Sequence, residues 1–96
     1  MHNTIRNIPK IFKAFASEKR IAILELLLKN KKGLAFSQMS QKLKINIPTL
    51  ERHALLLREV GLLESKRYKN KMVYKIISSK VDFVDKFITL AKVYNL

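Results

Sequence analysis

Apolar residues recur three and four positions apart along most of this chain, and this helical spacing is the feature that most restricts its fold. Residues 5–15 show such a stripe, and so do residues 80–95. Between them, Ser17 can cap a helix whose apolar stripe begins at Ile21 and whose end is expected within residues 30–33. The spacing therefore predicts a mainly helical fold.

The middle of the chain predicts two short helices separated by a tight break. Ser37 is expected to cap the first of them and Asn46 the second. Pro48 lies just inside the second helix, where its missing N–H is tolerated. The apolar positions of this second helix fall on one face: Leu50, Ala54 and Leu57. Helix, tight turn and helix thus follow one another.

Helical spacing ends at Gly61, a residue type that suits a helix C-terminus. Residues 62–67 and 72–77 read as strands around a polar stretch, residues 68–71, so a β-hairpin is expected. A brief apolar piece at residues 34–36 predicts a further small strand. The expected order is α-α-β-α-α-β-β-α, a mostly α (α+β) fold with a small β-hairpin. This is the element order of a winged helix-turn-helix, and the 96 residues have room for a single domain, residues 1–96.

The charge of the chain restricts the kind of partner that this fold can meet. It carries 20 Lys and Arg against 7 Asp and Glu, a net charge of +13, although 48% of its residues are hydrophobic. A folded domain with this excess is expected to bind a polyanion, nucleic acid first and an anionic membrane surface second. The basic excess lies on the hairpin and not on an amphipathic helix, which favours nucleic acid. No apolar run predicts a membrane span or a signal peptide, and a cytoplasmic location is expected.

The sequence contains few residues or motifs that are suited to catalysis or metal binding. Zero cysteines exclude disulfides and thiolate ligands. The motifs G-x-S-x-G and H-E-x-x-H and a phosphate-binding glycine loop are missing, so we expect neither an enzyme nor a cofactor. Asp82 and Asp85 are interpreted as acids at a solvated helix start, because two carboxylates alone make a weak transition-metal site. No metal is expected.

The polar face of the second helix of the pair is expected to enter the major groove of DNA, which admits one α-helix. Arg52 can pair with guanine or with a phosphate, and Glu51 can accept from cytosine or hold Arg52 in position. Leu55 on the same face can touch a thymine methyl or pack against another protein segment. The expected DNA contacts of the helix pair are Ser37, Gln38, Asn46, Pro48, Thr49, Glu51, Arg52 and His53.

The hairpin is expected to lie along the phosphate backbone or in the minor groove. It holds basic residues and no acid between positions 66 and 75. Its expected DNA contacts are Lys66, Arg67, Tyr68, Lys69 and Lys71. The alternative interpretation is that these lysines protect an exposed strand edge from aggregation.

Three stretches resemble the ArsR/SmtB-type winged-helix repressors: residues 14–24 (AFASEKRIAIL), 37–43 (SQMSQKL) and 48–63 (PTLERHALLLREVGLL). The resemblance implies a homodimeric transcriptional regulator. The chain departs from the family at Lys44, where the turn often has Gly, at Ala54, where Leu is frequent, and at Leu55, where a polar residue is usual. It also lacks the cysteines, and the histidine on the last helix, of the metal-sensing members.

The first and last helices, about residues 5–15 and 80–95, carry more apolar surface than a small monomer covers, and this surplus predicts a homodimer. Its expected interface residues are Ile8, Phe12, Phe83, Phe87, Leu90 and Tyr94. Two DNA-reading helices related by a two-fold axis would reach successive major grooves, about 34 Å apart, on an inverted-repeat site.

The sequence therefore predicts a sequence-specific regulator, expected to be a repressor, that binds double-stranded DNA as a homodimer. Two alternatives stay open. One is a basic protein that binds nucleic acid or chromatin without regard to sequence, and the other is a winged-helix module that binds proteins.

Overall fold

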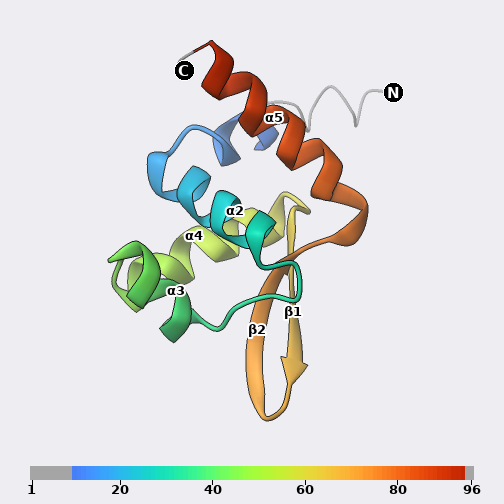
Figure 1. The fold of residues 1–96 in the computed structure, drawn as a ribbon. Coiled ribbons are helices and arrows are strands. Elements are labelled where there is room, and N and C mark those ends of the chain that lie inside the picture. The colour runs from blue at the N-terminus through green and yellow to red at the C-terminus, as the bar shows by residue number, and fades with distance from the viewer. Residues whose placement is uncertain (1–9, 95–96) are drawn as a thin grey trace.

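A computed structural model describes residues 10–94 of the protein. A helical body carries a two-stranded hairpin that projects from one end, and the last helix lies at the opposite end (Figure 1). Residues 10–14 are helical. The elements that follow are α2 (Glu18–Lys29), α3 (Phe36–Leu43), α4 (Ile47–Glu59), β1 (Leu63–Tyr68), β2 (Lys71–Ile76), a 3₁₀ turn (Ser78–Lys80) and α5 (Val81–Val93). This order confirms the expected winged helix-turn-helix. No helix in this described part of the chain has the length and apolar character needed to cross a membrane.

Helix α2 begins and ends where its sequence predicts. The backbone N–H of Arg20 donates to Ser17 Oγ at 3.2 Å, which confirms Ser17 as the N-cap. The helix closes at Asn30. Ile23, Leu24 and Leu27 are buried, so the core-facing stripe is centred on these three residues. This stripe forms the middle of the hydrophobic core.

Helix α3 starts earlier than expected, and the prediction of Ser37 as its cap is wrong. The helix begins at Phe36 with Ala35 at the N-cap position. The side chain of Gln38 supplies the capping contact, because its Oε1 accepts from the backbone N–H of Ala35 at 2.9 Å. Ser37 instead lies exposed in the first turn. The first backbone N–H groups of a helix have no partner within the helix. A glutamine three residues after the N-cap accepts from one of them, as the side chain of a serine N-cap would.

The start of α4 confirms the expected cap. The backbone N–H of Thr49 donates to Asn46 Oδ1 at 2.9 Å, and Pro48 lies in the first turn. The predicted apolar face, Leu50, Ala54 and Leu57, is the buried face.

The end of α4 requires glycine. Gly61 has a φ of +83°, a left-handed conformation that L side chains rarely adopt. Its N–H donates to Arg58 O and the N–H of Leu62 donates to Leu57 O, both at 3.0 Å. These paired bonds satisfy the last carbonyls of the helix and turn the chain into β1.

Strands β1 and β2 are antiparallel, and their turn is shorter than the polar stretch suggested. Tyr68 pairs with Lys71, so only Lys69 and Asn70 form the turn. Both have positive φ, 48° and 66°, as a type I′ turn requires. The small strand expected at residues 34–36 is reduced to one bridge, in which Leu34 and Tyr74 exchange backbone hydrogen bonds of 3.0 and 2.8 Å. This bridge attaches the start of the helix-turn-helix to β2.

Helix α5 packs on the core through one side only. Val84 and Ile88 are buried, as the predicted stripe requires. Phe87 stacks on Phe15 with ring centroids 4.0 Å apart, which joins α5 to the segment before α2. Phe83 and Leu90, on another face of this helix, are exposed.

Candidate nucleic-acid interface

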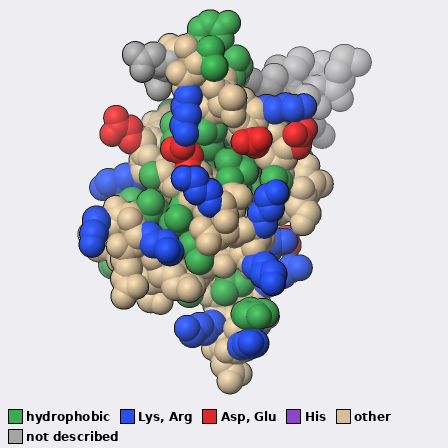
Figure 2. Space-filling view, viewed as in Figure 1, with side chains coloured by type: hydrophobic (Ala, Val, Ile, Leu, Met, Phe, Trp, Pro, Cys, Tyr) green, Lys and Arg blue, Asp and Glu red, His purple; other side chains and the backbone are tan. Residues whose placement is uncertain are grey.

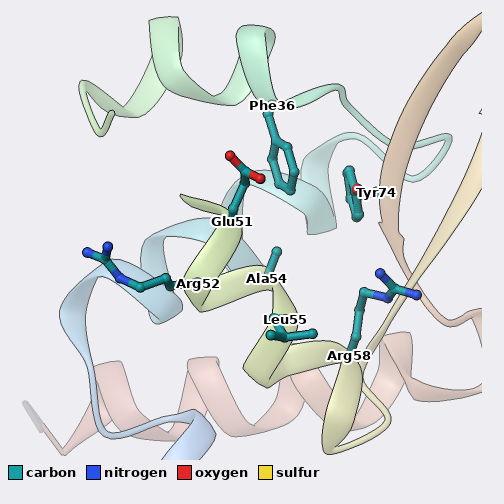
Figure 3. Close-up of a pocket in the computed structure, with 7 residues that line it drawn as sticks. All are labelled: Phe36, Glu51, Arg52, Ala54, Leu55, Arg58 and Tyr74. Atoms are coloured by element: carbon teal, nitrogen blue, oxygen red, sulfur yellow. The ribbon is translucent and has the colours of Figure 1, made fainter. Parts of the chain in front are cut away.

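The outer face of α4 is exposed and mostly polar. Glu51, Arg52, Arg58 and Glu59 are exposed along it, and Leu55 lies among them. In Figure 3, Arg52 and Arg58 extend from α4 in opposite directions, with Leu55 between them. No described element of the chain covers this face closely enough to bury it, so it is free to meet a partner.

Arg52 is held by the helix itself. Its Nη2 donates to Thr49 Oγ1 at 3.3 Å, one turn earlier. Glu51 makes no ion pair within residues 10–94, so the structure gives no support to the interpretation that Glu51 holds Arg52 in position. Adjacent residues on a helix point in different directions, which explains why Thr49 and not Glu51 is the partner.

His53 is tied to a residue 33 positions earlier. Arg20 Nη1 lies 3.2 Å from His53 Nδ1. Because arginine has donors and no acceptor, Nδ1 must accept, and the imidazole carries its proton on Nε2. Partial burial lowers the pKa of His53 below its ordinary value of 6.5, and the charge of Arg20 adds to this effect. The ring is therefore neutral at pH 7 with Nε2–H as its remaining donor.

Arg20 also donates to two carbonyls at the end of the first helical segment. Its Nη2 donates to Lys13 O at 2.7 Å and its Nε to Ala14 O at 3.1 Å. One guanidinium thus connects the end of the first helical segment with α4. Sequence reasoning missed this residue, because His53 lies 33 positions away and no spacing rule points to the carbonyls of Lys13 and Ala14.

The remaining predicted residues of the helix pair lie around the turn between α3 and α4. Gln38 and Asn46 are exposed but serve as caps. Ser37 and Pro48 are exposed, while Thr49 is half-buried. Sequence reasoning also missed Arg58, which the helical spacing from Leu55 could have indicated.

All five predicted hairpin residues are exposed: Lys66, Arg67, Tyr68, Lys69 and Lys71. Lys69 Nζ lies 5.4 Å from the centroid of the Tyr68 ring. Among the described residues, none of these cations forms an ion pair with an acid. Lys75 differs, because its Nζ contacts Glu64 Oε2 at 3.6 Å and its side chain is mostly covered. On the face shown in Figure 2, basic side chains are spread from the hairpin over the helical body, and the acidic ones gather towards α5.

An open pocket of about 290 Å³ lies between α4 and the base of the hairpin (Figure 3). Phe36 and Tyr74 stack at its edge, with ring centroids 4.2 Å apart and an interplanar angle of 17°. Glu51, Arg52, Ala54, Leu55 and Arg58 complete its lining. The stack connects α3 to β2 and keeps the hairpin beside α4.

Four of the six predicted dimer residues are exposed. Phe12, Phe83, Leu90 and Tyr94 are exposed, and Val93, which the sequence interpretation omitted, is exposed as well. Phe87 is half-buried because it stacks on Phe15. Ile8 lies outside the described residues.

The two aspartates of α5 are not gathered into a metal site. Asp82 contacts Lys86 Nζ at 3.1 Å, one turn later on the same exposed helix. Across residues 10–94, no three His, Cys, Asp or Glu side chains come close enough to hold a metal ion.

No protein-family model matches the chain. Its sequence is 31% identical to the transcriptional activator HlyU of Vibrio cholerae over 71 residues, which are 74% of this chain and 64% of HlyU. It is 28% identical to MJ1325 of Methanocaldococcus jannaschii, an uncharacterized HTH-type transcriptional regulator, over 82% of this chain and 88% of that protein. The relatives with similar sequences are thus transcriptional regulators.

Two solved structures have the same fold. HlyU from Vibrio cholerae matches over the whole of both chains with a TM-score of 0.77 and 26% identity. Mb0332 from Mycobacterium bovis matches over 98% of this chain and 82% of its own, with a TM-score of 0.81 and 22% identity. Mb0332 is described as a homodimeric winged helix-turn-helix DNA-binding domain and a possible ArsR-family regulator. The protein therefore has the winged helix-turn-helix fold, and it resembles regulators of the ArsR type.

In this fold, helix α4 occupies the position that is called the recognition helix, and the hairpin of β1 and β2 occupies the position that is called the wing. Lys44 takes the position where the family often has Gly, and it has a left-handed φ of 60°. Its N–H donates to Ser40 O at 2.9 Å. Lys44 therefore adopts the left-handed backbone of this turn, which glycine would adopt without strain.

Proposed function

We propose that this protein is a sequence-specific regulator of transcription that binds double-stranded DNA as a homodimer on an inverted repeat. The observation that carries the proposal is the exposed outer face of the recognition helix, with the basic wing beside it. Arg52 supplies the strongest candidate for a base contact on that face. A guanidinium can pair in bidentate fashion with the two major-groove acceptors of guanine.

The wing supplies the electrostatic part of the binding. Lys66, Arg67, Lys69 and Lys71 are exposed and have no acidic partner among the described residues. Cations of this kind release counterions when they contact phosphates, and this term acts on any sequence. The wing therefore adds affinity, and the recognition helix adds selectivity.

The start of the recognition helix offers a further place for a phosphate. The first turn of α4 holds Asn46, Pro48 and Thr49 at the end of the helix that carries a partial positive charge. A phosphate near this end would meet backbone N–H groups as well as the side chain of Asn46. His53 Nε2–H is a further donor for a phosphate.

The dimer is proposed from the exposed apolar side chains at the α5 end. Phe12, Phe83, Leu90 and Tyr94 are large hydrophobic residues with at least two fifths of their surface in contact with solvent. An exposed apolar group of this size usually marks a partner. In the homodimeric Mb0332, the same fold forms pairs.

We expect the protein to repress transcription where its site overlaps a promoter, because a bound dimer occupies that DNA. HlyU is named a transcriptional activator, so the direction of the effect on transcription is to be tested with a reporter gene whose promoter contains the site. Reporter expression is expected to fall with the site inside the promoter. Unchanged expression there would contradict repression by occupancy.

The test of the proposed function is selection from a random duplex pool, followed by fluorescence anisotropy at several salt concentrations. The expected result is an enriched inverted repeat that a random duplex does not displace. Equal competition by random duplex would indicate a sequence-neutral nucleic-acid binder. No duplex binding at low salt would favour a winged-helix module that binds proteins.

A further inference from the structure

We propose that Leu55 recognises the methyl group of a thymine in each half of the DNA site. This inference rests on the proposed function, because it assigns a base to one residue of the proposed DNA-binding face. Leu55 is an exposed apolar side chain among charged ones on that face.

The surroundings of Leu55 favour a contact outside the chain. The side chain is 55% exposed, and it lies on the open side of the pocket beside the wing. Leu55 is not buried by any described segment, so the alternative that it packs against another protein segment is not realised within residues 10–94.

The neighbours of Leu55 indicate what kind of partner meets it. Residues three and four positions away on a helix are its surface neighbours. For Leu55 all four are charged and exposed: Glu51, Arg52, Arg58 and Glu59. Figure 3 shows the two arginines on either side of it. An apolar group enclosed by charges makes a poor protein-binding patch, because those charges would have to lose their water.

DNA offers partners for both the charged side chains and the apolar one. Its major groove combines phosphates and polar base edges with one apolar group, the C5-methyl of thymine. Arginines at the flanks can keep polar partners on DNA while Leu55 covers the methyl. Cytosine lacks this methyl, so the contact discriminates between two pyrimidines.

The spacing also fits neighbouring base pairs. Arg52 and Leu55 are three residues apart, which is about 4.5 Å along a helix axis. Base pairs are stacked about 3.4 Å apart. If Arg52 contacts one base pair, Leu55 reaches the next one or the one after it, and the thymine is expected within two base pairs of the Arg52 contact.

The test uses the duplex recovered by selection, with each thymine of one half-site replaced in turn by deoxyuridine, which lacks only the methyl. We expect one substitution to weaken wild-type binding by about fourfold, the effect of one buried methyl group. The other thymines of the half-site are internal controls.

Two variants assign the effect to Leu55. Leu55→Ala should bind the thymine duplex about fourfold more weakly and should no longer distinguish it from the uridine duplex. Leu55→Met, which keeps an apolar side chain of similar volume, should still distinguish them. Because Leu55 is exposed, both variants should retain the melting temperature of the wild type within about 2–4 °C.

Three outcomes would overturn the inference. A selected site whose affinity is unchanged by every uridine substitution would overturn it while leaving the proposed function intact. So would uridine sensitivity that persists in Leu55→Ala. A change of sedimentation in Leu55→Ala together with a flat uridine scan would assign the residue to a protein contact. Failure to recover any site would instead count against the proposed function.

Discussion

At the scale of single residues, Arg20 shows how one side chain can connect the parts of a small domain. It donates to the carbonyls of Lys13 and Ala14 and to the ring of His53. The first helical segment belongs to the proposed dimer interface, and His53 belongs to the recognition helix. Arg20 is therefore a positioning residue between the two surfaces that the proposed function needs.

Partial burial of His53, together with the charge of Arg20 beside it, lowers its pKa and predicts a dependence of stability on pH. The folded protein lowers the pKa of His53, so the unfolded chain binds the proton more readily. This contribution to stability is complete above the ordinary pKa of 6.5 and is lost as the pH falls from 6.5 through the lowered folded-state value. We expect the free energy of unfolding in urea to decrease over that window.

The variant His53→Gln isolates the effect, since glutamine can accept from Arg20 but does not titrate. Its unfolding free energy should decline less than that of the wild type when the pH is lowered from 7.5 to 5.5. Parallel declines in the two proteins would show that His53 does not cause the dependence.

At the scale of elements, the turn between α3 and α4 carries strain that a substitution can remove. Lys44 has a left-handed backbone, which costs a residue with a side chain about 1 kcal/mol. Lys44→Gly should therefore raise the free energy of unfolding by about 0.5–1 kcal/mol and the melting temperature by several degrees. Lys44→Ala is the matched control, because it removes the charge and keeps the strain. An equal gain in both variants would attribute the effect to charge.

The wing and the recognition helix should respond differently to substitution. Lys69→Ala with Lys71→Ala should weaken binding to all duplexes and reduce the slope of log K against log salt by about 0.9 for every phosphate that the wing no longer neutralises. Arg52→Ala should also relax the sequence preference, at a cost of about 1–3 kcal/mol on the selected site.

Lys86→Ala provides the matched control for the wing variant, since Lys86 is exposed on α5 and contacts Asp82. It removes a positive charge at the end of the molecule away from the wing, and the salt slope should stay close to that of the wild type. Equal salt slopes and equal selectivity in the wing and Arg52 variants would refute the assignment of affinity to the wing and of selectivity to Arg52.

At the scale of the whole molecule, the wing projects from one end of the helical body and α5 lies at the opposite end (Figure 1). Leu90 is 56% exposed, so Leu90→Glu should leave the fold intact while placing a charge in the proposed dimer interface. We expect sedimentation of a dimer for the wild type at micromolar concentration and of a monomer for Leu90→Glu. We also expect weaker binding to the inverted repeat, because only one half-site is then held. A monomeric wild type would contradict the dimer.

Much of this fold follows from contacts between residues close in sequence. The cap at Asn46, the end of α4 at Gly61 and the buried face of α4 each depend on positions a few residues apart, and the sequence alone predicted them. The cap of α3 was predicted at the wrong residue. Ala35 has no side-chain acceptor, and the contact that replaces one comes from Gln38.

Other properties depend on residues that only the folded chain brings together. Phe87 belongs to the apolar surplus of α5, yet it stacks on Phe15, 72 positions away, in an arrangement that no local pattern predicts. Lys75 belongs to the basic hairpin, yet it pairs with Glu64 on the neighbouring strand. The sequence by itself determined the helices and their order, because periodicity is a local property, and it predicted a polyanionic partner, because charge is additive. Tertiary structure decided which cations, rings and leucines remain exposed, because burial depends on every element that packs around a side chain.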